Sequence, residues 1–301
     1  MNYQYLLKHP DLFPSVIGFK YYKFEILLKK FKTELRKAEN NKAWKYKRFR
    51  LPGGGRKATL KTDKQKLFFI LFYYKTYPTF RLAQSVFCFD KRNIQLWKNF
   101  LERILQKAIG YQLHLPKVKA KYLGQIIEIC PKLKDCLIEA SERKINRPKK
   151  TQEFYYSGKK KCHTIKNQIY VNPKSKKILV VSKTVEGKRH DKQLACDDLS
   201  LYAIPPGSTL MADTGYLGLD KENKRITNFI TPYKKPIKKQ LFDFQKQNNK
   251  QISSIRVRVE HPFAFMKSFH ILKNQFRGRI KQADMPFRTI ACLYNFNLSY
   301  R

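Results

Sequence analysis

Three acidic residues stand where acids are not expected in this chain. Glu139, Asp213 and Glu260 interrupt segments that are otherwise apolar or basic, and Asp and Glu together account for only 22 of the 301 residues. Hard cations such as Mg²⁺ require carboxylate clusters and leave ligand positions for phosphate oxygens. Two such ions, about 3.5–4 Å apart, activate the attacking oxygen and stabilise the leaving one. The three acids therefore predict a two-metal site for phosphodiester chemistry.

Asp213 follows the apolar run Leu210-Met211-Ala212 and precedes a glycine by two residues. This pattern predicts a short buried strand, residues 210–213, whose last residue leaves the sheet at a turn. A carboxylate at that place is unfavourable unless a cation holds it. The alternative is an N-cap for a following helix, which is a common place for Asp.

The elements that must position the acids change in type along the second half of the chain. Strands are predicted at residues 136–140, 163–171, 178–184, 210–213 and 226–231, with a hairpin turn at 173–175, and helices at 191–202 and 252–272. Residues 234–251 are expected to be polar and mobile, and Pro262 is expected to kink the last helix or to begin a new segment. This order predicts α/β layers around a mixed sheet.

The first half of the chain shows helical periodicity instead. Within residues 1–50, Phe24, Leu27, Leu28 and Phe31 share one helical face. Further helices are predicted at residues 64–75, 80–87 and 91–108, with Thr79 as a cap for the second of these. A connector, residues 110–134, holds a predicted helix at 119–130.

The helices predicted at 80–87 and 91–108 are joined by a tight turn, and together they form a helix-turn-helix pattern. The base-reading positions would be Lys91, Arg92, Asn93 and Gln95, with Trp97 and Leu101 packed underneath. An ordinary three-helix bundle with a solvated basic face is the alternative. The glycines at 53–55 lack the Gly-Lys-Ser/Thr ending of a phosphate loop. They indicate a basic linker in which Arg56 and Lys57 can lie along DNA.

Composition narrows the class of partner. Sixty-four Lys and Arg against 22 acids give a net charge of +42, which favours a polyanion, and nucleic acid is the commonest one. The longest apolar run, residues 67–74, is too short to cross a bilayer, and the N-terminus lacks a signal-peptide core. We expect no membrane partner. The cysteines lack paired spacing and predict reduced, mostly buried thiols in a cytosolic protein: Cys88, Cys130, Cys136, Cys162, Cys196 and Cys292.

Several motifs in the same order resemble the DDE transposases of bacterial insertion sequences, of the insertion-sequence-five type. The matching residues are Glu139-Ala140-Ser141-Glu142-Arg143, Asn146-Arg147-Pro148, Tyr155 to Lys161 with His163-Thr164, Gly187 with His190-Asp191, Ala212 to Gly218, Val259-Glu260-His261 with Lys267, and Asn295. Upstream, Gly53 to Lys57 and Thr76 to Phe80 resemble the helix-turn-helix region of the same group. The resemblance covers nearly the whole chain.

The resemblance implies a helical segment at 1–50, a helix-turn-helix region at 51–130 and a ribonuclease-H-like catalytic domain at 131–301. It implies that Glu139, Asp213 and Glu260 are catalytic and hold two Mg²⁺ ions, for which Mn²⁺ can substitute. Such an enzyme binds the terminal inverted repeats of its element as double-stranded DNA, cuts the strand to free a 3′-OH, and joins that end to target DNA. We expect a homodimer on DNA, in the bacterial cytoplasm and associated with the nucleoid.

The first acid departs from the family pattern. The family has Asp in an Asp-(Gly/Ala)-Thr-Glu motif, whereas this chain has Glu139, which keeps the charge but reaches one methylene further. Catalysis falls on the order of 10²-fold for ~1 Å of misplacement. Asp135 lies roughly 13 Å upstream at about 3.3 Å per residue and is a poor replacement. Glu142 falls on the opposite strand face and matches the family's own glutamate. We hypothesise that Glu139 binds metal with activity reduced or lost.

Other residues of the matching motifs have two interpretations each. Lys159, Lys160, Lys161 and Lys267 are interpreted as phosphate contacts, against a solvated hairpin tip for the first three. His190 and Asp191 orient the site or hold DNA, unless Asp191 is only a helix N-cap. Tyr155 and Tyr156 stack on a splayed base or pack in the fold. Arg256 and Arg258 touch the same DNA strand or form a basic helix face.

Two rival functions remain at this point. A decayed transposase that only occupies inverted repeats predicts salt-sensitive DNA binding without cleavage under any metal. A basic RNA-binding protein predicts a preference for RNA over duplex DNA.

Overall fold

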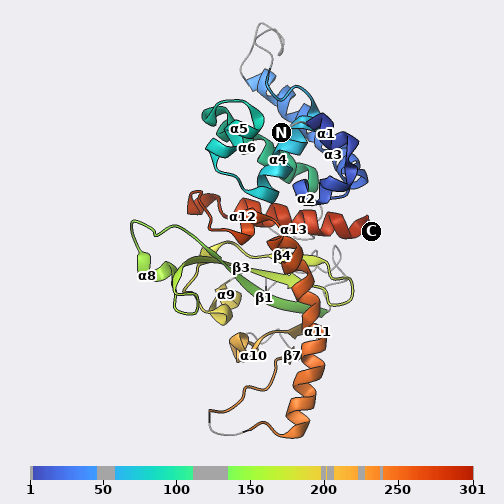
Figure 1. The fold of residues 1–301 in the computed structure, drawn as a ribbon. Coiled ribbons are helices and arrows are strands. Elements are labelled where there is room, and N and C mark those ends of the chain that lie inside the picture. The colour runs from blue at the N-terminus through green and yellow to red at the C-terminus, as the bar shows by residue number, and fades with distance from the viewer. Residues whose placement is uncertain are drawn as a thin grey trace. The chain divides into compact units, whose positions relative to one another are not determined.

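The computed structural model describes residues 3–45, 58–110, 135–197, 201, 207–222, 228–237 and 240–300. The linker with Arg56 and Lys57, and the predicted helix at 119–130 with its domain boundary, lie outside these residues. The chain divides into two compact units (Figure 1). One comprises residues 1–112, 268–274 and 296–301, and the other residues 113–267 and 275–295, so the grouping differs from the three consecutive segments expected from the sequence.

The first unit is helical. Its elements are α1 (Tyr3–Lys8), η1 (Pro10–Leu12), α2 (Phe13–Ile17), α3 (Tyr21–Lys45), α4 (Asp63–Thr76), α5 (Phe80–Phe87), α6 (Lys91–Ile109) and α12 (His270–Lys273). The predicted apolar face of α3 is buried at all four of its positions, Phe24, Leu27, Leu28 and Phe31. The N-terminal helical region is thus confirmed.

Local capping explains where the helices begin and end. The Thr62 side chain accepts a hydrogen bond from the Gln65 backbone N–H and forms a capping box at the start of α4. Thr79 caps α5 by accepting from the Leu82 N–H, as predicted. Tyr77 and Cys88 adopt left-handed backbone conformations, with φ of 46° and 55°, which end the two helices.

The cysteines are less buried than expected. All five described cysteines are free, but only Cys136 and Cys292 are buried. Cys88 is exposed because it forms the left-handed turn after α5, and Cys162 and Cys196 are half-buried. The prediction of mostly buried thiols is therefore wrong for the described residues.

A buried polar contact ties α4 to α6. The fully buried Tyr74 donates its hydroxyl to Glu102 Oε1 at 2.7 Å, and Lys98 Nζ contacts Glu102 Oε2 at 2.7 Å. Tyr74→Phe is expected to lower the free energy of unfolding by about 1.5–3 kcal/mol, since a buried carboxylate loses a hydrogen-bond donor. Urea unfolding followed by circular dichroism measures this. The control is Tyr22→Phe, which removes an exposed 2.9 Å bond to the Tyr300 carbonyl; equal effects of the two changes would contradict the prediction.

The second unit is built on a mixed sheet. Its strands are β1 (Asp135–Lys144), β2 (Tyr156–Ser157), β3 (Cys162–Val171), β4 (Ile178–Val181), β5 (Val185–Glu186), β6 (Thr209–Met211) and β7 (Asn228–Ile230). The order is β2-β3-β1-β6-β7, with β4 and β5 also paired to β3. β1 is antiparallel to β3 and parallel to β6, and β6 is parallel to β7. The predicted α/β architecture with a mixed sheet is confirmed.

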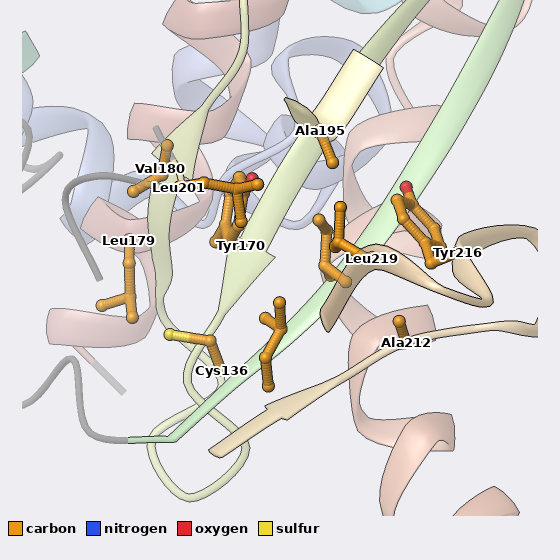
Figure 2. Close-up of a cluster of buried hydrophobic side chains, with 11 residues drawn as sticks. Cys136, Tyr170, Leu179, Val180, Ala195, Leu201, Ala212, Tyr216 and Leu219 are labelled. Atoms are coloured by element: carbon orange, nitrogen blue, oxygen red, sulfur yellow. The ribbon is translucent and has the colours of Figure 1, made fainter. Parts of the chain in front are cut away.

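The remaining elements are short helices and two longer ones, α11 and α13: α8 (Gln152–Tyr155), α9 (Asp191–Asp197), η5 (Thr214–Tyr216), α10 (Leu219–Glu222), α11 (Asp243–Lys267), η6 (Ile280–Gln282) and α13 (Asp284–Ser299), of which residues 296–299 belong to the helical unit. Figure 2 shows how Tyr170 of β3 packs with Ala195 of α9 and Leu219 of α10 in a buried cluster. Ile138 of β1 belongs to the same cluster. Because neighbouring strand residues point to opposite faces, Glu139 points to the other face.

Helix α11 packs against β1 and corrects two expectations. It begins at Asp243, inside the segment expected to be mobile, and it runs through Pro262 without a break. Proline inside a helix is unfavourable by about 3 kcal/mol. Buried Val259, Phe263 and Met266 follow helical spacing around Pro262, and their burial offsets that penalty.

One polar side chain secures the edge strand of this sheet. Asn295 accepts a hydrogen bond from the Ile178 N–H at 2.9 Å and donates to the Ile178 carbonyl at 2.7 Å. It thereby satisfies both backbone groups at the first residue of β4. Among the described residues, no helix is long and apolar enough to cross a membrane.

Candidate active site

Glu139 and Asp213 are brought level by the strand pairing. β1 and β6 run parallel, and Leu137 pairs with Met211. If this parallel register is extended by two residues beyond Leu137 and Met211, Glu139 stands beside Asp213. β6 ends at Met211, so Asp213 stands just beyond the strand rather than as its last residue.

Asp213 is both a helix N-cap and an acid paired with a cation. Its Oδ1 accepts a hydrogen bond from the Thr214 N–H at 2.7 Å and caps η5. The same oxygen lies 3.4 Å from Arg256 Nη1. The N-cap interpretation and the interpretation as an acid held by a cation therefore both apply.

Arg256 links the two acids. Its Nη2 donates to Glu139 Oε2 at 3.0 Å, while its Nη1 faces Asp213. Burial raises the pKa of Glu139 above its ordinary value, and the neighbouring guanidinium acts against that rise. Sequence reasoning proposed Arg256 as a DNA contact or part of a basic face and missed this pairing. A cation four residues before Glu260, on the same helix face, was the available signal.

Glu260 lies on the same hollow as Glu139. The hollow has a volume of about 490 Å³, and its lining includes Glu139, Ser141, Arg256, Glu260 and Lys267. Glu260 itself is exposed. Within the described residues, no three His, Cys, Asp or Glu side chains stand close enough together to hold a metal ion. The guanidinium of Arg256 occupies the space between the first two acids.

A second polar network lies on the opposite face of the sheet. Lys166 of β3 is buried and donates to Asp191 Oδ1 and to the Arg189 carbonyl, each at 2.7 Å. Its Nζ also lies 3.7 Å from Glu142, which accepts a hydrogen bond from Thr164 at 3.0 Å. The structure thus assigns the Asp191 carboxylate an ion-pair partner. Lys166 was missed, and because it stands among the polar residues Thr164, Asn167 and Gln168 in β3, its burial had no clear sequence signal.

Asp191 also lies beside the turn that carries Asp213. A Cβ added to Gly215 would stand 3.3 Å from Asp191 Oδ2, so the backbone passes close to this carboxylate. Gly187 is still more restricted, because a Cβ there would overlap the Thr164 hydroxyl. His190 is exposed, and its Nδ1 accepts a hydrogen bond from the Lys192 N–H at 3.4 Å.

The predicted phosphate contacts are spread along the unit. Lys267 lines the hollow, with its Nζ over the Phe263 ring at 5.5 Å. Lys159, Lys160 and Lys161 are exposed at the turn between β2 and β3. β3 pairs Ile169 with Glu139, so Lys161 at this turn lies roughly 26 Å along the strand from the acids at about 3.3 Å per residue. Arg258 donates to the Pro173 carbonyl at 3.2 Å.

The two tyrosines differ. Tyr155 is half-buried against the cluster of Ile145, Ile165, Phe276 and Ala283, which favours packing. Tyr156 is exposed, and its ring meets His163 edge-on at 5.7 Å.

In the helical unit, the four predicted base-reading residues of α6, Lys91, Arg92, Asn93 and Gln95, are all exposed. Leu101 is buried as expected. Trp97 is only half-buried and lines a surface hollow with Leu96 and Phe100, so it does not pack fully beneath the helix. It lies on the same side of α6 as Asn93 and Phe100, which turns it away from the core.

The fold and site define an α/β protein with a ribonuclease-H-like mixed sheet and two acids, Glu139 and Asp213, that share one arginine. A family model described as DDE superfamily endonuclease matches residues 138–295, more than half of the chain. The chain belongs to this family.

Curated relatives agree with this assignment. A probable transposase for insertion sequence element IS702 from Microchaete diplosiphon is 33% identical over 165 residues, covering 55% of this chain and 58% of the relative. A protein assigned as a transposase for insertion sequence element IS112 from Streptomyces albus G is 26% identical over 113 residues, covering 37% of this chain and 41% of that relative. The chain therefore spans about half the length of these relatives. No solved structure matches.

Proposed function

We propose that this protein is an insertion-sequence transposase that cleaves the DNA at the ends of its element and joins them to target DNA. One observation carries the proposal: Glu139 of β1 and Asp213, just beyond the end of the parallel strand β6, converge on one cation. Membership of an endonuclease family and likeness to insertion-sequence transposases support it.

The donor set suits a hard divalent cation. Carboxylate oxygens are the ligands that Mg²⁺ and Mn²⁺ prefer, and two of these acids already approach a single positive group. With Arg256 displaced from Glu139 and Asp213, these two acids and Glu260 of the same hollow would hold two Mg²⁺ ions. When bound, the metal activates the attacking oxygen and stabilises the leaving one.

The protein's own residues would supply the remaining interactions. Lys267 lines the hollow and binds a phosphate of the DNA strand there. Arg256 binds a second phosphate once it is released from the acids. Lys166 holds Asp191 against the turn at Gly215, which keeps Asp213 in place.

Duplex DNA is the proposed partner of the helical unit as well. The exposed start of α6 would enter the major groove as the second helix of a helix-turn-helix formed with α5. Binding to inverted repeats would then place one copy of the protein at each end of the element, as a homodimer in the cytoplasm of a bacterium.

A second candidate is a non-catalytic remnant that still occupies the inverted repeats. Two observations favour it: Glu139 replaces the family's Asp, and Arg256 already neutralises both acids without metal. The two candidates predict the same DNA binding and differ only in cleavage.

Cleavage of a supercoiled plasmid that carries the element's own ends tests the proposal. We expect nicked and linear products in Mg²⁺ or Mn²⁺ and none in EDTA. Equal products with and without divalent metal would refute metal-dependent cleavage. End binding without cleavage in any metal would establish the remnant. A competition gel with RNA separates the RNA-binding alternative.

Arg256→Gln is expected to raise the affinity of the DNA-free protein for Mn²⁺ on the order of 10-fold, because the guanidinium and the metal compete for the same carboxylates. Isothermal titration calorimetry measures this. Arg258→Gln is the matched control, since it removes an equal charge two residues away that bonds only a backbone carbonyl among the contacts described here. Equal Mn²⁺ affinity in the two variants would contradict the prediction.

A further inference from the structure

A strongly basic segment links β7 to the active-site helix. Residues 231–251, which we name the basic arm, contain one acid, Asp243, and six lysines: Lys234, Lys235, Lys238, Lys239, Lys246 and Lys250. The structure describes this arm except for residues 238–239. Figure 1 shows the first turns of α11, in orange, and the segment after β7 standing clear of the sheet.

The arm is held together by specific contacts. The Asn249 side chain accepts a hydrogen bond from the Tyr233 N–H at 2.8 Å and donates to the Tyr233 carbonyl at 3.1 Å. This pair fixes the extended part of the arm to α11. The Gln245 side chain accepts from the Phe242 N–H at 3.1 Å at the start of the helix. The second half of the arm is therefore helical from Asp243 on, and Tyr233 is bonded to that helix.

An aromatic cluster stands on this arm. The rings of Phe242 and Phe244 stack with centroids 5.9 Å apart and planes 10° apart, and Tyr233 meets Phe244 edge-on at 6.3 Å. Ile237, Phe242 and Phe244 are the most exposed large apolar side chains among the described residues, at 101%, 69% and 62%. Apolar groups gathered in this way mark an interaction site rather than chance exposure.

The positive charge around the aromatic cluster indicates which kind of partner binds there. A second copy of the arm would bring like charges together, so the cluster does not suit self-association. A membrane surface requires a helix with a continuous apolar face. Residues 245–251 of α11 are Gln-Lys-Gln-Asn-Asn-Lys-Gln and offer no such face. Duplex DNA fits both features, since its phosphates pair with lysines and its base steps accept apolar wedges.

We propose that the basic arm is a further DNA-contacting surface of this protein. Phe242 and Phe244 insert against the bases of duplex DNA at a distorted step, and Lys246 and Lys250 contact the flanking phosphates. The inference rests on the proposed function for its partner, and it adds a surface that neither the acid site nor α6 provides.

Binding of the full chain to random-sequence duplex DNA, measured by fluorescence anisotropy over a range of salt, tests the arm. We expect Phe242→Ser with Phe244→Ser to weaken binding on the order of 10-fold at every salt concentration, because ring–base contacts carry no charge. We expect Lys246→Gln with Lys250→Gln to reduce the slope of log K against log salt by about 1.8, at about 0.9 for each phosphate contact. Tyr5→Ser, which changes another exposed aromatic residue, in α1, is the control and should change neither.

A second readout addresses the wedge itself. Duplex DNA containing 2-aminopurine should brighten with the parent and not with the double phenylalanine variant, because unstacking of the base relieves quenching. Parent-like DNA binding by both arm variants would overturn the inference. So would arm variants that lose only binding to phosphatidylserine vesicles, or that change only the sedimentation of the free protein.

The lysine variant keeps the test decisive if the phenylalanine variant misfolds, as checked by circular dichroism. Failure of the arm and failure of the proposed function are also distinguishable. The arm is tested by binding to DNA that lacks the element's ends, whereas the proposed function is tested by metal-dependent cleavage at those ends. Loss of one result leaves the other interpretable.

Discussion

Asp213→Asn is expected to reduce metal-dependent DNA cleavage on the order of 10³-fold, equivalent to about 4 kcal/mol of transition-state stabilisation. Asp213 stands level with Glu139, and both approach Arg256, so its carboxylate lies at the centre of the proposed site. Asparagine has the same shape but cannot neutralise a divalent cation. Its amide oxygen can still accept the Thr214 N–H, which preserves the cap of η5. The change therefore removes charge without removing the turn.

The measurement is initial cleavage rate on plasmid carrying the element's ends, together with affinity for the same ends. Affinity should stay within about twofold of the parent, because the proposed base-reading residues lie on α6. Asp220→Asn is the control, since it makes the same chemical change at an exposed position of α10. Parent-like cleavage by Asp213→Asn would remove the acid pair from the mechanism.

The sequence predicted elements whose signals are local. The Thr79 cap and the α3 stripe of Phe24 and Leu27 depend only on neighbouring residues, and both are found in the structure. The strand predicted at 163–171 is found as β3. The continuity of α11 through Pro262 could not be predicted in this way. It depends on burial of Val259 and Phe263, which no local pattern reveals.

The candidate site shows the same division. Glu139, Asp213 and Glu260 were recognisable because acids are rare in this chain. That Glu139 stands beside Asp213 follows from the parallel register of β1 and β6, which joins distant segments. The contacts that these acids make also depend on how distant segments pack. Arg256 reaches both carboxylates only because α11 packs on β1, so its contact is a property of the fold.

The start of α11 inside the basic arm was not predicted, for a different reason. The arm's lysines, glutamines and asparagines have the composition of a solvated segment, which predicts a polar and mobile segment. The reciprocal hydrogen bonds between Asn249 and Tyr233 use side-chain and backbone groups that propensity rules do not count.

Glu139→Asp is the second change with a large expected effect, in the opposite direction. We expect a gain in cleavage on the order of 10²-fold, because the family's shorter acid restores a ligand position that glutamate misses by about 1 Å. The structure adds a second reason. Glu139 Oε2 reaches Arg256 Nη2 at 3.0 Å, and removing a methylene withdraws the carboxylate by about 1.5 Å along the side chain. Aspartate should therefore pair less well with Arg256 and compete better for metal.

Cleavage rate and Mn²⁺ affinity should rise together in Glu139→Asp. Glu142→Asp is the matched control, because it shortens another glutamate of β1 that faces Thr164 and Lys166 on the opposite side of the sheet. No gain is expected there. Glu139→Gln, which keeps the length and loses the charge, should cleave less than the parent. A Glu139→Asp protein no more active than the parent would show that the first acid does not limit cleavage. Arg256→Gln would then test whether the ion pairs of Arg256 with both acids limit cleavage.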